Sequence, residues 1–106
     1  MPEPGRKKLQ SLLMRSDLRF KEEALTEWQR LDGSVREQFK KKLAERLVHP
    51  RVPAARLSGH PDRYKIKLRN AGFRLVYEVR DAQVVVVVVA VGKRERNAVY
   101  EAAAKR

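Results

Sequence analysis

The sequence predicts one small α+β domain, built from an N-terminal strand, an antiparallel helical hairpin, a three-strand antiparallel meander and a C-terminal helix. Two observations support this prediction: apolar residues recur at helical spacing in the first half of the chain, and they alternate with charged residues in the second half. Helices followed by a run of strands favour α+β over a parallel βαβ fold. The 106 residues suit a single domain. We expect residues 1–13 to be a flexible extension and residues 14–106 to form the domain.

A short strand and a first helix are predicted at the start of the domain. Residues 15–20 alternate at period two, which is typical of a strand. The helix covers residues 21–31, and Asp32-Gly33 ends it because glycine tolerates the left-handed conformation at a helix end. The apolar positions of this helix are Leu25, Trp28 and Leu31.

A second helix is predicted from Ser34 to the residue before Pro50. Ser34 and Glu37 have the spacing of a capping box, in which each side chain satisfies a free backbone N–H of the other residue. Because the connection between the two helices is so short, we expect them to pack as an antiparallel hairpin. The apolar stripe of the second helix consists of Phe39, Leu43 and Leu47.

A β-hairpin is predicted after a connector that contains three turn residues. In residues 64–69 apolar side chains alternate with Lys65, Lys67 and Arg69, so the two kinds of side chain lie on opposite faces. Asn70-Ala71-Gly72 is a three-residue turn with glycine at its end. The partner strand then begins at Phe73.

The third strand of the meander contains six consecutive valines, Val84–Val89. β-Branched residues favour a strand, and a run without alternation predicts burial on both faces, so we expect this strand in the interior of the sheet. A turn at residues 81–83 precedes it. Residues 92–96 leave the sheet, and the alanine-rich residues 97–106 are predicted to be helical.

Composition limits the possible partners and excludes several classes of site. The chain has 25 Lys and Arg against 13 Asp and Glu, a net charge of +12, which attracts nucleic acid, an acidic protein or an anionic membrane. Without cysteine it has no disulfide, cysteine zinc site or thiol nucleophile. The longest apolar run, Val84–Val91, is too short to span a bilayer. We therefore expect a soluble cytoplasmic protein without a membrane partner.

The predicted hairpin gathers positive charge on one face. Lys65 and Lys67 emerge roughly 7 Å apart on the polar side of their strand, and Arg74 begins the partner strand near Lys67 and Arg69. We expect this surface to carry no carboxylate. It is either an ordinary solvated sheet face or a phosphate-binding surface. Cations from the end of the next strand that would join it are Lys93, Arg94 and Arg96.

Such a cluster permits RNA cleavage without a metal or another cofactor. Crowded positive charges lower one another's pKa, so one lysine becomes a usable base, while arginines stabilise a phosphorane-like transition state. RNA supplies its own nucleophile, the 2′-OH, and the product would be a 2′,3′-cyclic phosphate. The weak point is the acid, because arginine is a poor proton donor. His49 and His60 are expected to be loop or capping residues, which argues against a paired-histidine ribonuclease. From the residues alone, enzyme and binder stay open.

Several segments in order resemble the RelE family of bacterial and archaeal toxin–antitoxin systems. The resemblance extends from about Leu18 to the C-terminus. It implies a RelE-like fold and a ribosome-dependent mRNA endonuclease that cleaves mRNA in the ribosomal A site and inhibits translation. The matching segments are Val35–Leu43, Tyr64–Arg69, Gly72–Tyr77, Val91–Arg96 and Val99-Tyr100.

The resemblance also implies roles for five residues. Lys65 and Lys67 match the two active-strand lysines, of which Lys67 is our choice for the general base on the 2′-OH. Arg74 matches the arginine that stabilises the transition state. Arg94 matches the arginine that assists the leaving group, and Tyr100 matches the tyrosine that stacks on the cleaved nucleotide.

Partners follow from the same resemblance: a cognate antitoxin, the 70S ribosome and mRNA, with operator DNA bound only through the antitoxin complex. Ser58 departs from the family, because close relatives carry a basic residue there that contacts RNA. A ParE-like toxin that inhibits DNA gyrase and a non-catalytic basic nucleic-acid-binding module are the alternatives. The expected RNA and ribosome contacts are Lys40, Lys41, Lys42, Arg69, Lys93 and Arg96, the first three being otherwise an ordinary solvated helix face.

Overall fold

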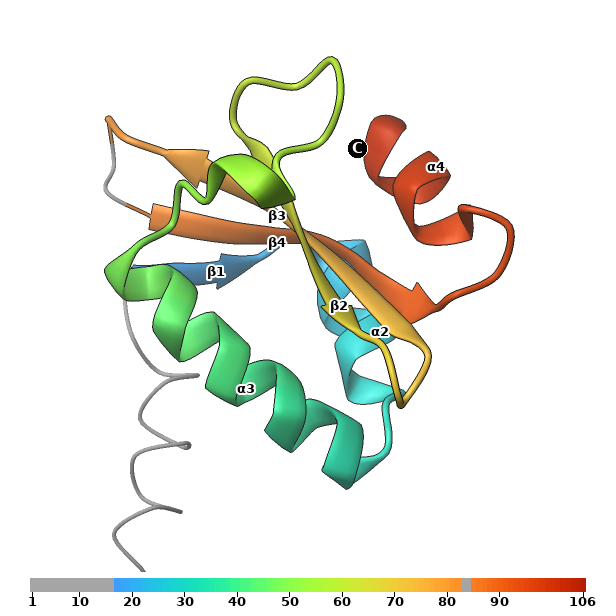
Figure 1. The fold of residues 1–106 in the computed structure, drawn as a ribbon. Helices are drawn as coiled ribbons and strands as arrows, with labels where there is room; N and C mark the ends of the chain where they lie inside the picture. The colour runs from blue at the N-terminus through green and yellow to red at the C-terminus, as the bar shows by residue number, and fades with distance from the viewer. Residues whose placement is uncertain (1–16, 83–84) are drawn as a thin grey trace, which may run out of the picture.

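The computed structural model describes residues 17–82 and 85–106, which form three helices, a short 3₁₀ turn and four strands (Figure 1). The predicted extension, residues 1–13, lies outside the described residues, as do the first two residues of the predicted N-terminal strand. Among the described residues, no helix combines the length and apolar character needed to cross a membrane. The elements are β1 (Leu18–Phe20), α2 (Glu22–Gln29), α3 (Gly33–Val48), η1 (Pro53–Ala55), β2 (Arg63–Leu68), β3 (Phe73–Arg80), β4 (Val85–Lys93) and α4 (Ala98–Ala104).

The four strands form one sheet in the order β1-β4-β3-β2. Strands β2, β3 and β4 are the predicted antiparallel meander, and β1 pairs with β4 in parallel. The α+β class and the order of the elements are therefore confirmed.

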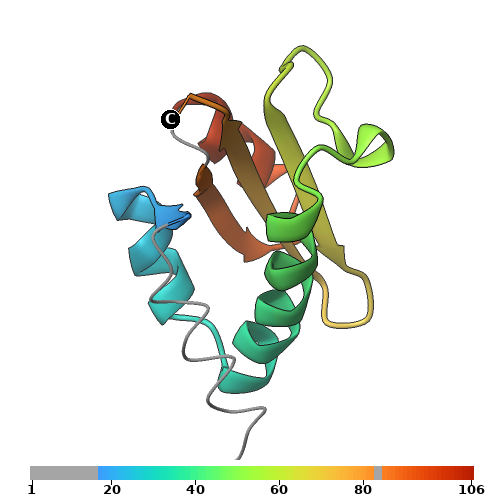
Figure 2. The same ribbon diagram turned by 90° about the vertical axis from the view of Figure 1, so that its left-hand side faces the viewer.

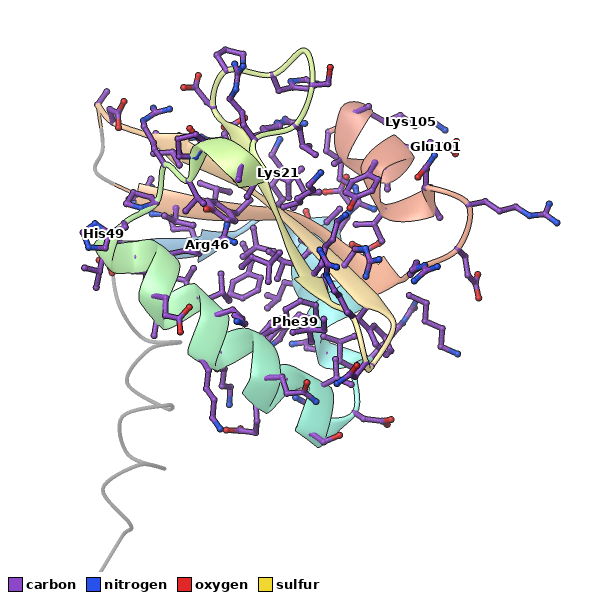
Figure 3. All side chains as sticks on the ribbon, in the orientation of Figure 1. Lys21, Phe39, Arg46, His49, Glu101 and Lys105 are labelled. Atoms are coloured by element: carbon purple, nitrogen blue, oxygen red, sulfur yellow. The ribbon has the colours of Figure 1, made fainter. Side chains whose placement is uncertain are left out.

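Helices cover both faces of the sheet. Figure 1 shows α3 and α4 on opposite sides of the β2–β3 hairpin. The larger core lies under α2 and α3, where Trp28 and Phe39 pack against each other with ring centroids 6.3 Å apart; Phe39 points from α3 towards the sheet (Figure 3). The smaller core lies under α4 and consists of Val76, Val89, Ala90, Val99 and Ala103.

The valine strand occupies the interior of the sheet, as predicted. β4 lies between β1 and β3, and Val85–Val89 are all buried, while Val84 lies outside the described residues. The pairing of β3 with β4 is irregular: Val76 pairs with Ala90 and Tyr77 pairs with Val88, which leaves Val89 as an extra residue. A bulge of this kind places Val89 and Ala90 in the same core, under α4.

Two details of the helical hairpin differ from the prediction. Helix α3 begins at Gly33 with Asp32 in the N-cap position and no side-chain cap, so the capping box of Ser34 and Glu37 is wrong. The helix starts one residue early, which puts Ser34 inside its first turn. Leu25 is 42% exposed, because the buried face of α2 is centred on Ala24 and Trp28.

The hairpin itself forms, but its two helices diverge in a V (Figure 2). They diverge because α2 packs mainly on the interior strand β4, whereas α3 packs on β2, an edge strand of the sheet.

Burial along α3 gives a test of this packing. Leu43→Ala removes a fully buried side chain and should lower the free energy of unfolding by about 2–5 kcal/mol. Val48→Ala, on the same helix at 69% exposure, should change it by less than about 0.5 kcal/mol. Urea denaturation measures both, and equal losses would contradict the assigned core.

Candidate active site

Register brings the predicted cations together on one face of the β2–β3 hairpin. Lys67 is the partner of Arg74 across the two strands, and Lys65 is the partner of Val76. Their neighbours in the sequence, Tyr64 and Ile66, are buried in the core under α2 and α3. The lysines therefore lie on the face that α4 covers in part, away from the large core.

A pocket of about 150 Å³ lies where this face meets the β4–α4 connection. It brings together four of the five predicted catalytic residues, while Lys65 and Arg69 lie beside it and Arg96 is exposed in the connection without lining it. Glu95 corrects the expectation of a surface without a carboxylate. The pocket is lined by Lys67, Arg74, Lys93, Arg94, Glu95, Asn97, Ala98, Val99 and Tyr100.

Sequence reasoning missed Glu95 and Asn97 as lining residues. Both lie in the segment between the last strand and the last helix, directly beside Arg94 and Arg96. The available signal was their position between residues already singled out, since each residue type alone is typical of a loop.

Arg74 is a buried cation. It was expected on an open polar face, yet the residue is only 8% exposed, because the pocket closes around it. Its Nη1 donates a hydrogen bond to the carbonyl oxygen of Phe73 at 3.0 Å, and no carboxylate of the described residues pairs with it. Removing a charge from water without a counter-ion is costly, so this guanidinium favours an anion in the pocket.

The surroundings of Lys67 lower the pKa of its amine. The positive charge of Lys65 is the largest cause that lowers its pKa, followed by desolvation of the amine and by the charge of Arg74, with smaller effects of Arg69 and Arg94. A lower pKa leaves more of the amine neutral at neutral pH. Only the neutral amine accepts a proton, so Lys67 is suited to act as a base.

Tyr100, in the first turn of α4, carries an unsatisfied hydroxyl. Its ring packs against the smaller core, and its buried hydroxyl oxygen has no hydrogen-bond partner among the described residues. Leaving such a group unpaired costs about 1–3 kcal/mol. This cost is unusual in a native core, and here it falls on a residue that lines the pocket.

The connection between β4 and α4 holds the pocket together through an uncommon backbone. Arg96 and Asn97 have φ angles of 42° and 62°, in the left-handed region that residues other than glycine rarely adopt. The backbone N–H of Arg94 donates to the carbonyl oxygen of Gly72 at 2.8 Å, which ties the connection to the β2–β3 turn. Packing thus holds a strained segment directly beside the cations.

The comparisons with known proteins identify the family and the fold of the chain. The model of the family described as the ParE toxin of type II toxin–antitoxin systems (parDE) matches residues 18–98. The mRNA interferase toxin RelE of Escherichia coli K12 is 60% identical over 89 residues, which are 84% of this chain and 94% of the relative. The chain belongs to the RelE family of toxins.

Solved RelE structures have the same fold. The isolated E. coli RelE toxin is 58% identical with a TM-score of 0.72, covering 84% of this chain and 95% of that chain. The toxin in the intact E. coli RelBE toxin–antitoxin complex is 59% identical with a TM-score of 0.71, covering 74% of this chain and 96% of that chain. A RelE variant with two arginines replaced by alanine, in the free state, has a TM-score of 0.78 at 57% identity, covering 84% of this chain and 94% of that chain.

The other residues expected from the RelE resemblance lie apart from the pocket. Lys40, Lys41 and Lys42 are on α3, which covers the opposite face of the sheet. The side chain of Lys40 is only 12% exposed and pairs with Glu37 at 3.0 Å, whereas Lys41 and Lys42 are exposed. Ser58 is exposed in the connector before β2. Within the described ranges, no group of three or more histidine or acidic side chains is arranged to hold a metal ion.

The pKa of Lys67 should depend on Lys65. Lys65→Met removes the largest opposing charge and should raise the pKa of Lys67 towards its ordinary value. Lys42→Met, on the far side of the sheet, should leave it unchanged. Titration of the lysine Cε resonances by NMR measures both, and an unmoved Lys67 in the Lys65 variant would contradict the assigned cause.

The unpaired hydroxyl of Tyr100 predicts an unusual mutant. Tyr100→Phe should raise the free energy of unfolding by about 1 kcal/mol, because it removes a buried group without a partner. Tyr77→Phe is the control: that hydroxyl donates to the carbonyl oxygen of Pro50 at 2.7 Å and accepts from Arg46 at 2.9 Å, so its loss should destabilise. If denaturation shows equal losses for both variants, the hydroxyl of Tyr100 has a partner in solution.

Proposed function

We propose that this protein is the toxin of a type II toxin–antitoxin system and acts in the cytoplasm as a ribosome-dependent mRNA endonuclease, cleaving mRNA in the ribosomal A site. One observation carries the proposal: Lys67 faces Arg74 across two strands, and both line a pocket with Arg94 and Tyr100. The relatives named mRNA interferase support the same activity, since they are 60% identical over most of the chain.

The residues suit cleavage by the 2′-OH of the RNA itself, without a metal ion. Neutral Lys67 takes the proton of the 2′-OH, whose oxygen then attacks the adjacent phosphorus. Arg74 stabilises the negative charge of the phosphorane-like transition state. The bond to the 5′-oxygen breaks, with Arg94 offsetting the charge of the leaving oxygen as it takes a proton from water. The products are a 2′,3′-cyclic phosphate and a 5′-hydroxyl end.

Tyr100 completes the proposed site by stacking on a base of the bound mRNA. Lys65 contributes indirectly, because its charge is the largest cause that lowers the pKa of Lys67.

The ribosome compensates for the weak proton donor of this site by positioning the mRNA. Arginine keeps its proton at any ordinary pH and is a poor proton donor, so the site alone is a weak nuclease. A host that fixes the mRNA in an in-line geometry contributes much of the missing rate through positioning. Lys41 and Lys42 on α3 serve as contacts to ribosomal RNA, whereas Lys40 would first have to leave its ion pair with Glu37. Arg69, Lys93 and Arg96 extend the contact around the pocket. Ser58 offers no charge to such a contact.

Inhibition comes from a cognate antitoxin. The solved RelBE complex gives this precedent in a relative that is 59% identical. An acidic segment suits a chain of net charge +12 and would cover its cationic face. Operator DNA is then bound only through the complex.

Gyrase inhibition is the alternative that the description of the matching family suggests. A toxin that acts by binding a protein has no need of a lysine with a lowered pKa opposite a buried arginine. The same feature disfavours a non-catalytic nucleic-acid-binding module. The site therefore favours RNA cleavage over both.

Primer extension on a defined mRNA with programmed 70S ribosomes tests the proposal. The wild type should cut within the A-site codon only when ribosomes are present, and Arg74→Ala or Arg94→Ala should slow cleavage by about 10²–10³-fold. Arg19→Ala, an exposed residue on β1, should cut normally. Cleavage at full rate by either pocket variant, or none by folded wild type, would refute the proposal.

A further inference from the structure

Helix α4 carries Tyr100 and packs on the sheet through small apolar side chains. It has seven residues, too few for a stable helix on their own. Its buried side chains, Val99 and Ala103, are small, and they pack on small residues of the sheet. The N-cap residue, Asn97, makes no side-chain cap hydrogen bond. We therefore expect polar contacts elsewhere on the helix to contribute to the position of Tyr100.

The polar contact between α4 and the sheet is made by Arg63. Its Nη1 donates to the carbonyl oxygen of Ala103 at 2.5 Å, in the last turn of α4. Arg63 begins β2, and because side chains on one face of a strand recur every second residue, it shares its face with Lys65 and Lys67. One strand thus presents the proposed base and also holds the helix that carries Tyr100.

Glu78 orients the Arg63 side chain. The two residues are partners across β2 and β3, and Nε of Arg63 donates to Oε1 of Glu78 at 3.1 Å. Burial raises the pKa of Glu78, but hydrogen bonds from Arg80 and Arg63 outweigh it and lower that pKa. Glu78 therefore stays charged and fixes the guanidinium, whose positive charge favours the carbonyl end of a helix.

A second anchor lies beyond the helix, at the chain end. Nη1 of Arg106 donates to Oε1 of Glu27 at 2.7 Å and to the carbonyl oxygen of Val89 at 3.0 Å. Nζ of Lys21, labelled in Figure 3, donates to the carbonyl oxygen of Arg106 at 2.5 Å. These contacts tie the end of the chain to α2 and to β4, which β3 separates from β2. Within the described ranges, Arg63 is the side chain of β2 that hydrogen-bonds to α4 itself, so it sets the position of the helix relative to the lysines.

We propose that Arg63 is a positioning residue for RNA cleavage, which holds Tyr100 in register with Lys67 through the carbonyl oxygen of Ala103. Ala103 lies one helical turn from Tyr100, so a shift of the last turn moves the ring directly. The inference rests on the proposed function, because the value of a fixed Tyr100 is in stacking a base of the mRNA.

Arg63→Gln and Arg80→Gln form a matched pair for the test. Both remove a cation bound to Glu78, but only Arg63 also contacts α4. In the ribosome-dependent cleavage assay, Arg63→Gln should lower kcat about 10-fold or more, with KM nearly unchanged, because misplacement affects the reacting geometry. Arg80→Gln should cleave like the wild type. Equal kcat values for the wild type and Arg63→Gln would overturn the proposal.

A double-mutant cycle separates positioning from a general loss of structure. If Arg63 acts through Tyr100, Arg63→Gln should have little further effect on kcat in a Tyr100→Ala protein. A full additional loss in that background would show that Arg63 acts elsewhere, and the proposal would fail.

Hydrogen exchange of the α4 amides tests the anchor without any cleavage. Arg63→Gln should speed exchange in residues 98–104 while β3 and β4 stay protected, and Arg80→Gln should not. Arg63→Lys, which keeps a charge beside Glu78, replaces the glutamine variant if that variant does not fold. If the wild type fails to cleave mRNA, the proposed function is refuted. If hydrogen exchange in α4 is unchanged in the Arg63 variant, the anchoring of α4 by Arg63 is refuted, whatever the cleavage assay shows.

Discussion

Burial of β4 on both faces is the constraint on which the structure depends. Val85–Val89 must be covered from two sides, so helices lie on both faces of the sheet. Two helices with large side chains, such as Phe39, fill one side, and the short α4 with Val99 and Ala103 fills the other. Because α4 is short, it covers only part of its face. The cationic pocket forms at the end that α4 leaves open.

The same two strands supply both the core and the site, which links stability to function. On one face Tyr64 and Ile66 are buried, and on the other Lys65 and Lys67 repel each other and their arginine neighbours. Such repulsion destabilises the folded chain, and the core on the other face of the same strands offsets it. A slip of one residue in the β2–β3 register would put the lysines into the core, so the fold fixes the register strongly.

The sequence predicted the features that depend on a local pattern, such as the cationic face of the hairpin. It did not predict the features that depend on contacts between distant segments. Alternation and the predicted three-residue turn placed Arg74 near Lys67 and Arg69, but the turn spans residues 69–72, and this register pairs Lys67 with Arg74. The local pattern did not predict that Arg74 is buried, since this depends on how the β4–α4 connection folds over the hairpin. The contact of Arg63 with Ala103 joins residues 40 positions apart and has no local signal. The capping box failed for the opposite reason: a local pattern was present, but the helix began one residue earlier.

Among the described residues, two groups in the pocket are incompletely paired, and this links the proposed substrate to the proposed inhibitor. The buried guanidinium of Arg74 has no carboxylate among the described residues, and the hydroxyl of Tyr100 has no hydrogen bond there. The buried charge and the unpaired hydroxyl each cost free energy before binding. Both costs fall when an anionic, hydrogen-bonding ligand enters the pocket. An RNA phosphate offers anionic oxygens of this kind, and so does a carboxylate of an acidic antitoxin segment. On the proposed function the two ligands would compete for the same groups of the pocket.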